Sequence, residues 1–377
     1  MYRNIRRIID LMSIQKDYSD NCHTDRIFGL DIFRAIAIIL VVKEHGSFLL
    51  KNTVLDSLPS IKMIDGVDLF FVLSGYLIGS ILLKEINSGE KFGIRELIRF
   101  WRRRWLRTLP NYYLILFANY LIIYFGIIQE DIQQFNWKFF FFLQNFSSPF
   151  HGFFWESWSL TIEEWFYISV PIFLILFLKF LTPKKSFILV TVLMIVFPFL
   201  YRIGIMNYSI NDFYLYDITF RKIVMTRLDS IAYGLLASWV YYYFNNYWVK
   251  FKTSSFIIGI GLIVFVLNYE AEYNTLYKQV IYFALGPISA MFLLPFAESI
   301  KMHKGVFVGI ITHVSKISYS MYLLNLALIA EVVRDNFAPT NEIDGIVKYL
   351  LFWFFVLVGS SVLYKYYEKP ILNFRDR

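Results

Sequence analysis

Long apolar runs recur along the whole chain, and they constrain its fold more than any other feature. Hydrophobic residues make up 57% of the 377, and the runs approach the roughly 20 residues that a helix needs to cross a bilayer core. Such runs predict α-helices, because lipid offers no partners to backbone polar groups. The expected fold is an all-α polytopic membrane protein with about ten transmembrane helices, near 30–50, 67–84, 111–128, 164–181, 186–202, 223–243, 255–268, 278–297, 316–331 and 346–366.

The charges between these runs indicate how the spans are oriented. Lys and Arg crowd every second loop, whereas the intervening loops are poorer in them and in places acidic. The positive-inside rule then places both termini in the cytosol, which requires an even number of spans and agrees with ten. We expect a cytosolic tail over 1–29, an apolar membrane domain over 30–370 and a second cytosolic tail over 371–377.

Composition disfavours several classes of protein. The net charge of +8 is explained by topology and anionic lipid, so membrane lipid is an expected partner and nucleic acid is not. The N-terminal segment lacks the features of a secretory signal. The single cysteine, Cys22, cannot form an internal disulfide, and no Cys/His cluster has the spacing of metal ligands, so no metal is expected. The expected location is the plasma or inner membrane.

Two polar residues inside the first apolar run are candidate functional residues. Arg34 and His45 are eleven residues apart, so on a helix they share one face, about 16 Å apart along the axis. Ionisable groups within a span are costly and are functional candidates by default. A cation and a proton acceptor on one stripe could bind an anionic substrate at one depth and transfer a proton at another. The alternative is a snorkelling arginine with a histidine near the outer end.

Further ionisable residues are expected at the depth of His45. The second, fourth and sixth spans all start on the outer side, and their first turns carry Asp68, then Glu163 and Glu164, then Arg227 and Asp229. We expect these groups to form one outer layer. A carboxylate beside His45 would set its tautomer and raise its basicity, and Asp68 is the candidate. Alternatively, each group caps a helix end or pairs structurally.

A run of arginines precedes the third span. Arg104 and Arg107 are three residues apart, hence on one helix face, and can grip a phosphate through fork-like pairs of donors. The alternative is a basic belt that binds anionic lipid and sets the topology. Arg102 and Arg103 fit that alternative well.

An ordered set of motifs resembles the membrane acyltransferase 3 family. It opens with Gly29-Leu30-Asp31 followed by Arg34 and His45, and continues with GVDLFFVLSGYLI over 66–78. The segments RRRWLRTLP (102–110), WSLTIEE (158–164) and SYSMYLL (318–324) follow in the family's order, and YEKP (367–370) resembles its closing element. The resemblance covers roughly residues 26–374.

The resemblance implies an enzyme that moves an acyl group, usually acetyl, from cytosolic acyl-CoA to a hydroxyl of a carbohydrate at or beyond the outer face. The family's functional Arg and His map onto Arg34 and His45, and its paired arginines map onto Arg104 and Arg107. One departure is Asn325, which stands where many relatives have His, so that proton transfer at this position is in doubt. No hydrolase-like domain follows the last span, so a second transfer step is not expected.

The candidate residues of such a site can be assigned chemical roles. Acyl transfer needs a base for the attacking hydroxyl and stabilisation of the oxyanion. His45 is the predicted base, with Asp68, Glu163 and Glu164 as the catalytic carboxylates. Arg34, Arg104 and Arg107 are predicted to bind the acyl-CoA, and Trp158, Tyr76 and Asn325 to contact the carbohydrate. No Ser-His-Asp arrangement can be recognised in the sequence, which favours direct transfer over an acyl-enzyme.

A function of another class remains open. A transporter or flippase of a lipid-linked sugar could line its path with the same buried charges. Transporters more often show paired half-length or Gly/Pro-broken helices in symmetric positions, which this sequence lacks. A transporter would also run without consuming acyl-CoA. No obligate protein partner is indicated.

Overall fold

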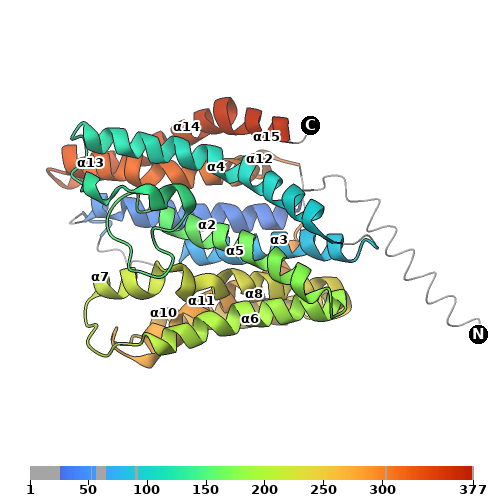
Figure 1. Cartoon of the computed structure of the whole chain (residues 1–377). Helices are drawn as coiled ribbons and strands as arrows, with labels where there is room; N and C mark the ends of the chain where they lie inside the picture. The colour runs from blue at the N-terminus through green and yellow to red at the C-terminus, as the bar shows by residue number, and fades with distance from the viewer. Residues whose placement is uncertain (1–25, 52, 57–64, 90–91, 302–303, 376–377) are drawn as a thin grey trace, which may run out of the picture.

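The computed structural model describes residues 26–51, 53–56, 65–89, 92–301 and 304–375, and within these ranges it is helical, with no β-strand (Figure 1). Cys22 and most of the predicted N-terminal tail lie outside the described residues. The long helices are α2 (Phe28–Gly46), α3 (Gly66–Ile86), α4 (Ile94–Tyr124), α5 (Ser157–Phe177), α6 (Pro183–Gly204), α8 (Val224–Tyr243), α10 (Lys252–Asn268), α11 (Tyr282–Glu298), α12 (Val306–Leu324) and α14 (Glu342–Leu363).

Four π-helical segments extend these helices or join them to short ones. They are η4 (Asp217–Arg221), η5 (Tyr277–Ile281), η6 (Asn325–Ala330) and η7 (Tyr364–Glu368). Segment η6 joins α12 to α13 (Glu331–Asn336), and η7 joins α14 to α15 (Lys369–Arg375). The remaining short elements are α7 (Phe213–Tyr216), α9 (Asn245–Lys250), and the 3₁₀ turns η1 (Ser47–Leu50), η2 (Ile132–Gln134) and η3 (Trp137–Phe141).

Helices occupy all ten predicted spans, and the chain is a multi-pass membrane protein. Within the described residues, six helical segments are long and apolar enough to cross a membrane: Gly66–Ile86, Ser157–Phe177, Pro183–Gly204, Tyr277–Glu298, Val306–Asn336 and Glu342–Arg375. Helix α10 has only 17 residues, and α2, α4 and α8 are more polar. The count of ten and the cytosolic placement of both termini therefore stay predictions.

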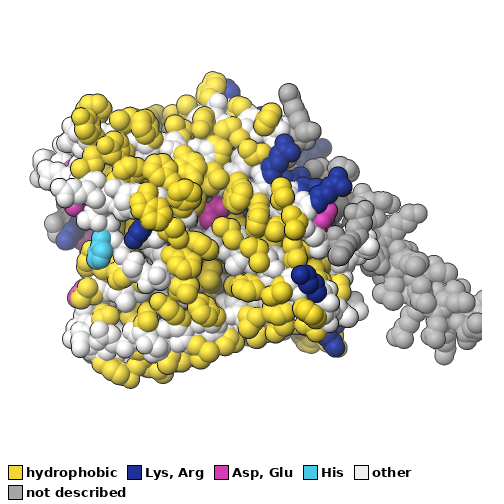
Figure 2. Space-filling model, viewed as in Figure 1, with side chains coloured by type: hydrophobic (Ala, Val, Ile, Leu, Met, Phe, Trp, Pro, Cys, Tyr) yellow, Lys and Arg dark blue, Asp and Glu magenta, His cyan; other side chains and the backbone are white. Residues whose placement is uncertain are grey.

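The long helices run alternately up and down in one bundle. Helix α2 begins, and α15 finishes, at the same end of the bundle (Figure 1). Lys and Arg side chains gather at this end, whereas the sides of the bundle are covered by hydrophobic side chains (Figure 2). We call it the basic end, and the other the opposite end. The broad apolar belt is the surface expected to face lipid.

Helix α3 lies at the centre and touches α8 backbone to backbone. A Cβ atom on Gly75 would lie 2.0 Å from the carbonyl oxygen of Ile231, and one on Gly234 would lie 2.1 Å from that of Val72. Only glycine fits at both positions, as is common where membrane helices approach closely. This contact holds α3 against α8 and leaves its other face for the site described next.

Candidate active site

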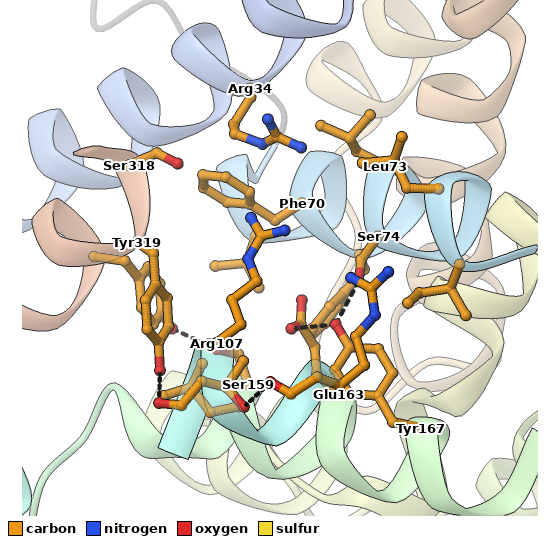
Figure 3. A pocket seen from close by; sticks show the side chains of 18 residues that line it. Arg34, Phe70, Leu73, Ser74, Arg107, Ser159, Glu163, Tyr167, Ser318 and Tyr319 are labelled. Carbon is orange, nitrogen blue, oxygen red and sulfur yellow. Dashed lines mark hydrogen bonds between the residues drawn. The ribbon is translucent and has the colours of Figure 1, made fainter. Parts of the chain in front are cut away.

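A pocket in the middle of the bundle gathers three arginines. It lies among α2, α3, α4, α5 and α12, and Arg34, Arg104 and Arg107 line it together with Glu163 (Figure 3). Three guanidinium groups against one carboxylate give the pocket a net positive charge. Guanidinium groups bind carboxylates and phosphates through paired hydrogen bonds, so the pocket is suited to an anionic ligand.

Arg104 and Arg107 reach this pocket because α4 is longer than the third predicted span. The helix begins at Ile94 and has 31 residues, so the arginine run lies within it and not in a loop. Arg104 and Arg107 form no ion pair with any residue that the structure describes. Their neighbours Arg102 and Arg103 are exposed. Only one face of the arginine run thus points into the bundle, and its charges are available to a ligand.

Arg34 is held at the pocket from the basic-end side. Its Nη1 lies 3.9 Å from Asp31 Oδ1 and 3.4 Å from Ser315 Oγ. Ser315 donates to Asp31 over 2.8 Å, and Arg26 also pairs with Asp31. Since Asp31 is shared between two arginines and a serine, it fixes the position of Arg34 while leaving much of its charge for the pocket.

A chain of three hydrogen-bonded groups enters the same pocket, and sequence reasoning missed two of them. The Tyr167 hydroxyl donates to Glu163 Oε2 over 2.8 Å, and Ser74 Oγ lies 2.7 Å from the same hydroxyl. All three residues line the pocket (Figure 3). The available signals were the Ser-Gly pair in α3 and the spacing of four between Glu163 and Tyr167, which places both on one helix face.

Glu164 points away from this chain toward α4. Its carboxylate accepts from Trp105 Nε1 over 3.1 Å and from Thr108 Oγ1 over 2.8 Å. Both predicted carboxylates of the fourth span thus lie beside the arginine helix. The expectation that they share an outer layer with His45 is wrong, because α5 brings them to the middle of the bundle.

His45 is paired with Asn325 and not with Asp68. Its Nδ1 lies 2.5 Å from Asn325 Oδ1. Asn325 Nδ2 donates to the carbonyl oxygens of Met321 and Tyr322, both over 2.8 Å, so its amide orientation is determined. Because an amide oxygen only accepts, His45 Nδ1 must carry the proton, and Nε2 keeps its lone pair. This is the tautomer that a general base acting through Nε2 needs.

Asp68 belongs to a different arrangement. It pairs with Arg227 of α8, and Arg202 of α6 pairs with Asp229 of α8 over 2.7 Å. These four residues are buried. The prediction that Asp68 orients His45 is therefore wrong: its carboxylate is taken by a cation on α8. Both pairs join helices, as paired charges within membranes usually do.

The two predicted sugar-stacking aromatics have no free ring face in the structure. Trp158 is packed edge-on against Phe71 and carries the Arg221 guanidinium 5.0 Å from its ring centre. Tyr76 stacks on Trp248, with ring centres 5.8 Å apart, and is not among the residues that line the pocket. Both side chains are buried, so the stacking predictions are not supported by their packing.

The opposite end carries charges near His45. Arg221 bonds Asp65 over 2.6 Å and Asp217 over 3.1 Å, and both Arg221 and Asp65 are partly exposed. Tyr322 connects this region to the pocket: it lines the pocket, and its hydroxyl contacts Ser159 Oγ over 2.6 Å. Asn325 follows one turn later. His45 therefore lies beyond Tyr322, between the pocket and the opposite end. No three His, Cys, Asp or Glu residues in the described ranges are placed to hold a metal ion.

Several known proteins are similar to this sequence. A family model described as an acyltransferase domain matches residues 27–365. A Staphylococcus aureus (strain COL) protein named "Putative O-acetyltransferase SACOL0978" is 27% identical over 386 residues, which cover 91% of this chain and 56% of that protein. The Peptidoglycan O-acetyltransferase OatA of Listeria monocytogenes is 32% identical over 170 residues, covering 42% of this chain and 25% of that protein.

The chain spans about half the length of the Staphylococcus protein. No solved structure is similar enough to be matched. The family match extends from the residue before α2 into η7 and so includes every residue of the pocket. The ordered motifs and the family model agree, and the chain belongs to the membrane acyltransferase family that the model describes as an acyltransferase domain.

Proposed function

We propose that this chain is a membrane O-acyltransferase that moves an acyl group, which we take to be acetyl, from acyl-CoA to a hydroxyl of a cell-envelope carbohydrate. The observation that carries the proposal is the pocket in which Arg34, Arg104 and Arg107 meet a single lining carboxylate, Glu163. The names of the relatives, an O-acetyltransferase and a peptidoglycan O-acetyltransferase, support the choice of acetyl and of a glycan acceptor.

The donor would enter from the basic end. Acyl-CoA carries several phosphates on a long, narrow arm that ends in the thioester. The exposed cations of the basic end favour the approach of such an anion. Arg104 and Arg107 can hold phosphate through paired hydrogen bonds, while Arg34 faces them across the pocket (Figure 3). The Arg34 guanidinium can stabilise the oxyanion that forms on a thioester carbonyl.

The acceptor would enter from the opposite end. His45 Nε2 is the candidate base for its hydroxyl, since the bond from Nδ1 to Asn325 leaves Nε2 unprotonated. Asn325 thus has a defined part as the residue that positions His45. A hydroxyl deprotonated by His45 becomes the nucleophile for the acyl carbon, and His45 passes the proton on to solvent at this end.

The donor pocket provides the direct test. Arg104→Gln/Arg107→Gln removes two charged donors while keeping side chains of similar length. Charge-assisted hydrogen bonds contribute roughly 1.5–3 kcal/mol each, so we expect acetyl-CoA to bind at least about tenfold more weakly to the purified variant. Arg102→Gln/Arg103→Gln is the matched control, because both side chains are exposed on the same helix.

The two variants separate the proposal from its alternatives. Equal acetyl-CoA affinity in wild type and in the pocket variant would leave the arginines as a lipid-binding belt. A second measurement compares surface glycans of a deletion strain and its parent by mass spectrometry. Unchanged acylation of the glycans, with loss of a lipid-linked sugar from the outer leaflet, would favour a flippase instead.

A further inference from the structure

The pocket that would bind the donor and the base that would activate the acceptor are not the same place. His45 is not among the residues that line the pocket with Arg34, Arg104 and Arg107. Its contact, Asn325, lies one helical turn beyond Tyr322, which does line it. The pocket itself offers another nucleophile.

Ser74 is the pocket hydroxyl whose hydrogen bonds suit it to attack. Tyr167 has one hydroxyl proton and donates it to Glu163 over 2.8 Å. The Tyr167 oxygen can therefore only accept in its 2.7 Å contact with Ser74, so Ser74 must donate. The result is a directed chain from the Ser74 hydroxyl through Tyr167 to a carboxylate. Proton transfer along it would leave the Ser74 oxygen free to form a bond.

The other pocket hydroxyls are held differently. Ser318 donates to the carbonyl oxygen of Ser315 over 3.0 Å, and Ser159 bonds the Tyr322 hydroxyl, which itself donates to the carbonyl oxygen of Glu156. Thr108 does donate to a carboxylate, that of Glu164. Glu164, however, does not line the pocket, and it also accepts from Trp105. Ser74 is only half-buried and lines the pocket together with its whole relay.

We propose that Ser74 carries the acyl group as a covalent ester between the donor and the acceptor, with Tyr167 and Glu163 moving its proton. This inference rests on the proposed function, because it assumes acyl-CoA as the donor. It replaces direct transfer, the mechanism favoured by the sequence, with two steps on one serine.

The first step is balanced within the pocket. Ser74 Oγ forms a bond to the thioester carbon, and the carbon–sulfur bond breaks. The Ser74 proton moves to Tyr167 as the Tyr167 proton moves to Glu163. CoA leaves as a thiolate, which the pocket arginines stabilise and which takes its proton from solvent at the basic end. The products are acyl-Ser74, neutral Tyr167 and protonated Glu163.

The second step runs the relay in reverse. The acceptor hydroxyl attacks the acyl carbon, and its proton goes to His45 and then to solvent at the opposite end. The bond between the acyl carbon and Ser74 Oγ breaks. Glu163 returns its proton through Tyr167 to the serine oxygen. The enzyme regains its starting state, and the net change is acyl transfer from CoA to the acceptor.

The test uses the purified full chain with radiolabelled acetyl-CoA and no acceptor. After rapid quenching, we expect wild type to carry one acetyl group, and peptide mass spectrometry to place it on Ser74. Ser74→Ala should bind acetyl-CoA normally but remain unlabelled and fail to acetylate glycan. Ser74→Cys should form a hydroxylamine-sensitive thioester at the same position. Ser80→Ala, in the same helix but outside the pocket, should label like wild type.

The relay has its own readout. Tyr167→Phe breaks the chain but keeps the ring, so we expect the rate of Ser74 labelling to fall about 10²-fold or more with donor affinity unchanged. A purely structural Tyr167 would instead lower affinity and labelling together.

Failures of the two proposals are distinguishable. Wild-type glycan acetylation by well-folded Ser74→Ala, or stable label on Thr108 in place of Ser74, would overturn the acyl-serine and leave the acyltransferase intact. Absence of both acetyl-CoA binding and glycan acetylation in wild type would overturn the proposed function itself.

Discussion

Replacing Asn325 by Ala tests the most specific geometric claim, that this amide selects the tautomer of His45. The Asn325 side chain makes three hydrogen bonds: one with His45 Nδ1 and two to backbone carbonyls of its own helix. Turning the amide to accept a different histidine tautomer would sacrifice the two backbone bonds. At roughly 0.5–1.5 kcal/mol each, they favour the observed orientation by about 1–3 kcal/mol. That corresponds to a ratio of about 5 to 150 between the tautomer with Nε2 free and the other tautomer.

Asn325→Ala removes this preference without touching the donor pocket. Without it the two tautomers would be about equally populated, so the fraction with Nε2 free would fall about twofold. We therefore expect acyl transfer to the acceptor to slow by about twofold, far less than the complete loss of a general base would cost. Acetyl-CoA affinity should stay unchanged, because Asn325 does not line the pocket. The assay measures acceptor turnover and acetyl-CoA binding on purified protein, at matched amounts of folded enzyme.

A matched control is Asn268→Ala. Asn268 also donates to the carbonyl four residues earlier, Val264, but it is exposed at the end of α10. It should retain the turnover of wild type. If Asn325→Ala turned over acceptor as fast as this control, the tautomer argument would be refuted, and His45 would need another source of orientation or another role.

Three further outcomes are expected. His45→Ala should form the acyl-enzyme but transfer its acyl group to acceptor about 10²–10⁴-fold more slowly, measured as chase of label into glycan. Asp68→Asn should reduce the yield of folded protein, because it leaves Arg227 buried without its carboxylate, a loss of roughly 3–5 kcal/mol. Burial and the nearby Glu331 carboxylate raise the pKa of Glu130 to about 8. Protonated Glu130 therefore stabilises the folded state fully at pH values below the pKa that this side chain has in the unfolded chain, and this stabilisation is lost as the pH rises toward 8. Thermal stability should fall between pH 5 and pH 9 in wild type, and Glu130→Gln should make that fall smaller.

The helices could be predicted because each apolar run indicates a helix independently of the rest of the chain. In lipid a run of apolar residues must form a helix whatever its neighbours do, so the ten predicted segments coincide with helices. The end of α4 that carries the arginines was left outside the third predicted span by the same reasoning, since hydropathy cannot separate a polar helical extension from a connection. That difference moved Arg104 and Arg107 into the bundle.

Side-chain partners were predicted less well, because depth alone does not determine which face of a helix points where. Asp68 and His45 were placed at similar depths, yet the rotation of α3 turns Asp68 to Arg227. Asn325 was recognised as a departure from the family's motif, but its contact with His45 depends on how α12 packs against α2. Ser74 and Tyr167 carry no charge and so gave no signal in a reading based on buried ionisable groups.

The π-helical segment η6 makes one backbone hydrogen bond near this site depend on a residue count. A π turn contains more residues than an α turn, and η6 begins at Asn325 within one continuous rod from Val306 to Asn336. Loss of a single codon among residues 326–330 could be absorbed by an ordinary α turn, which would keep the rod intact. Residues after the deletion would keep their faces on the rod. An ordinary α turn would nevertheless give the Ala327 N–H a carbonyl partner in its own helix, in place of the Glu156 carboxylate that it now reaches over 2.7 Å. Such a deletion, invisible to any scan of substitutions, would alter the site while leaving every residue that lines it in place.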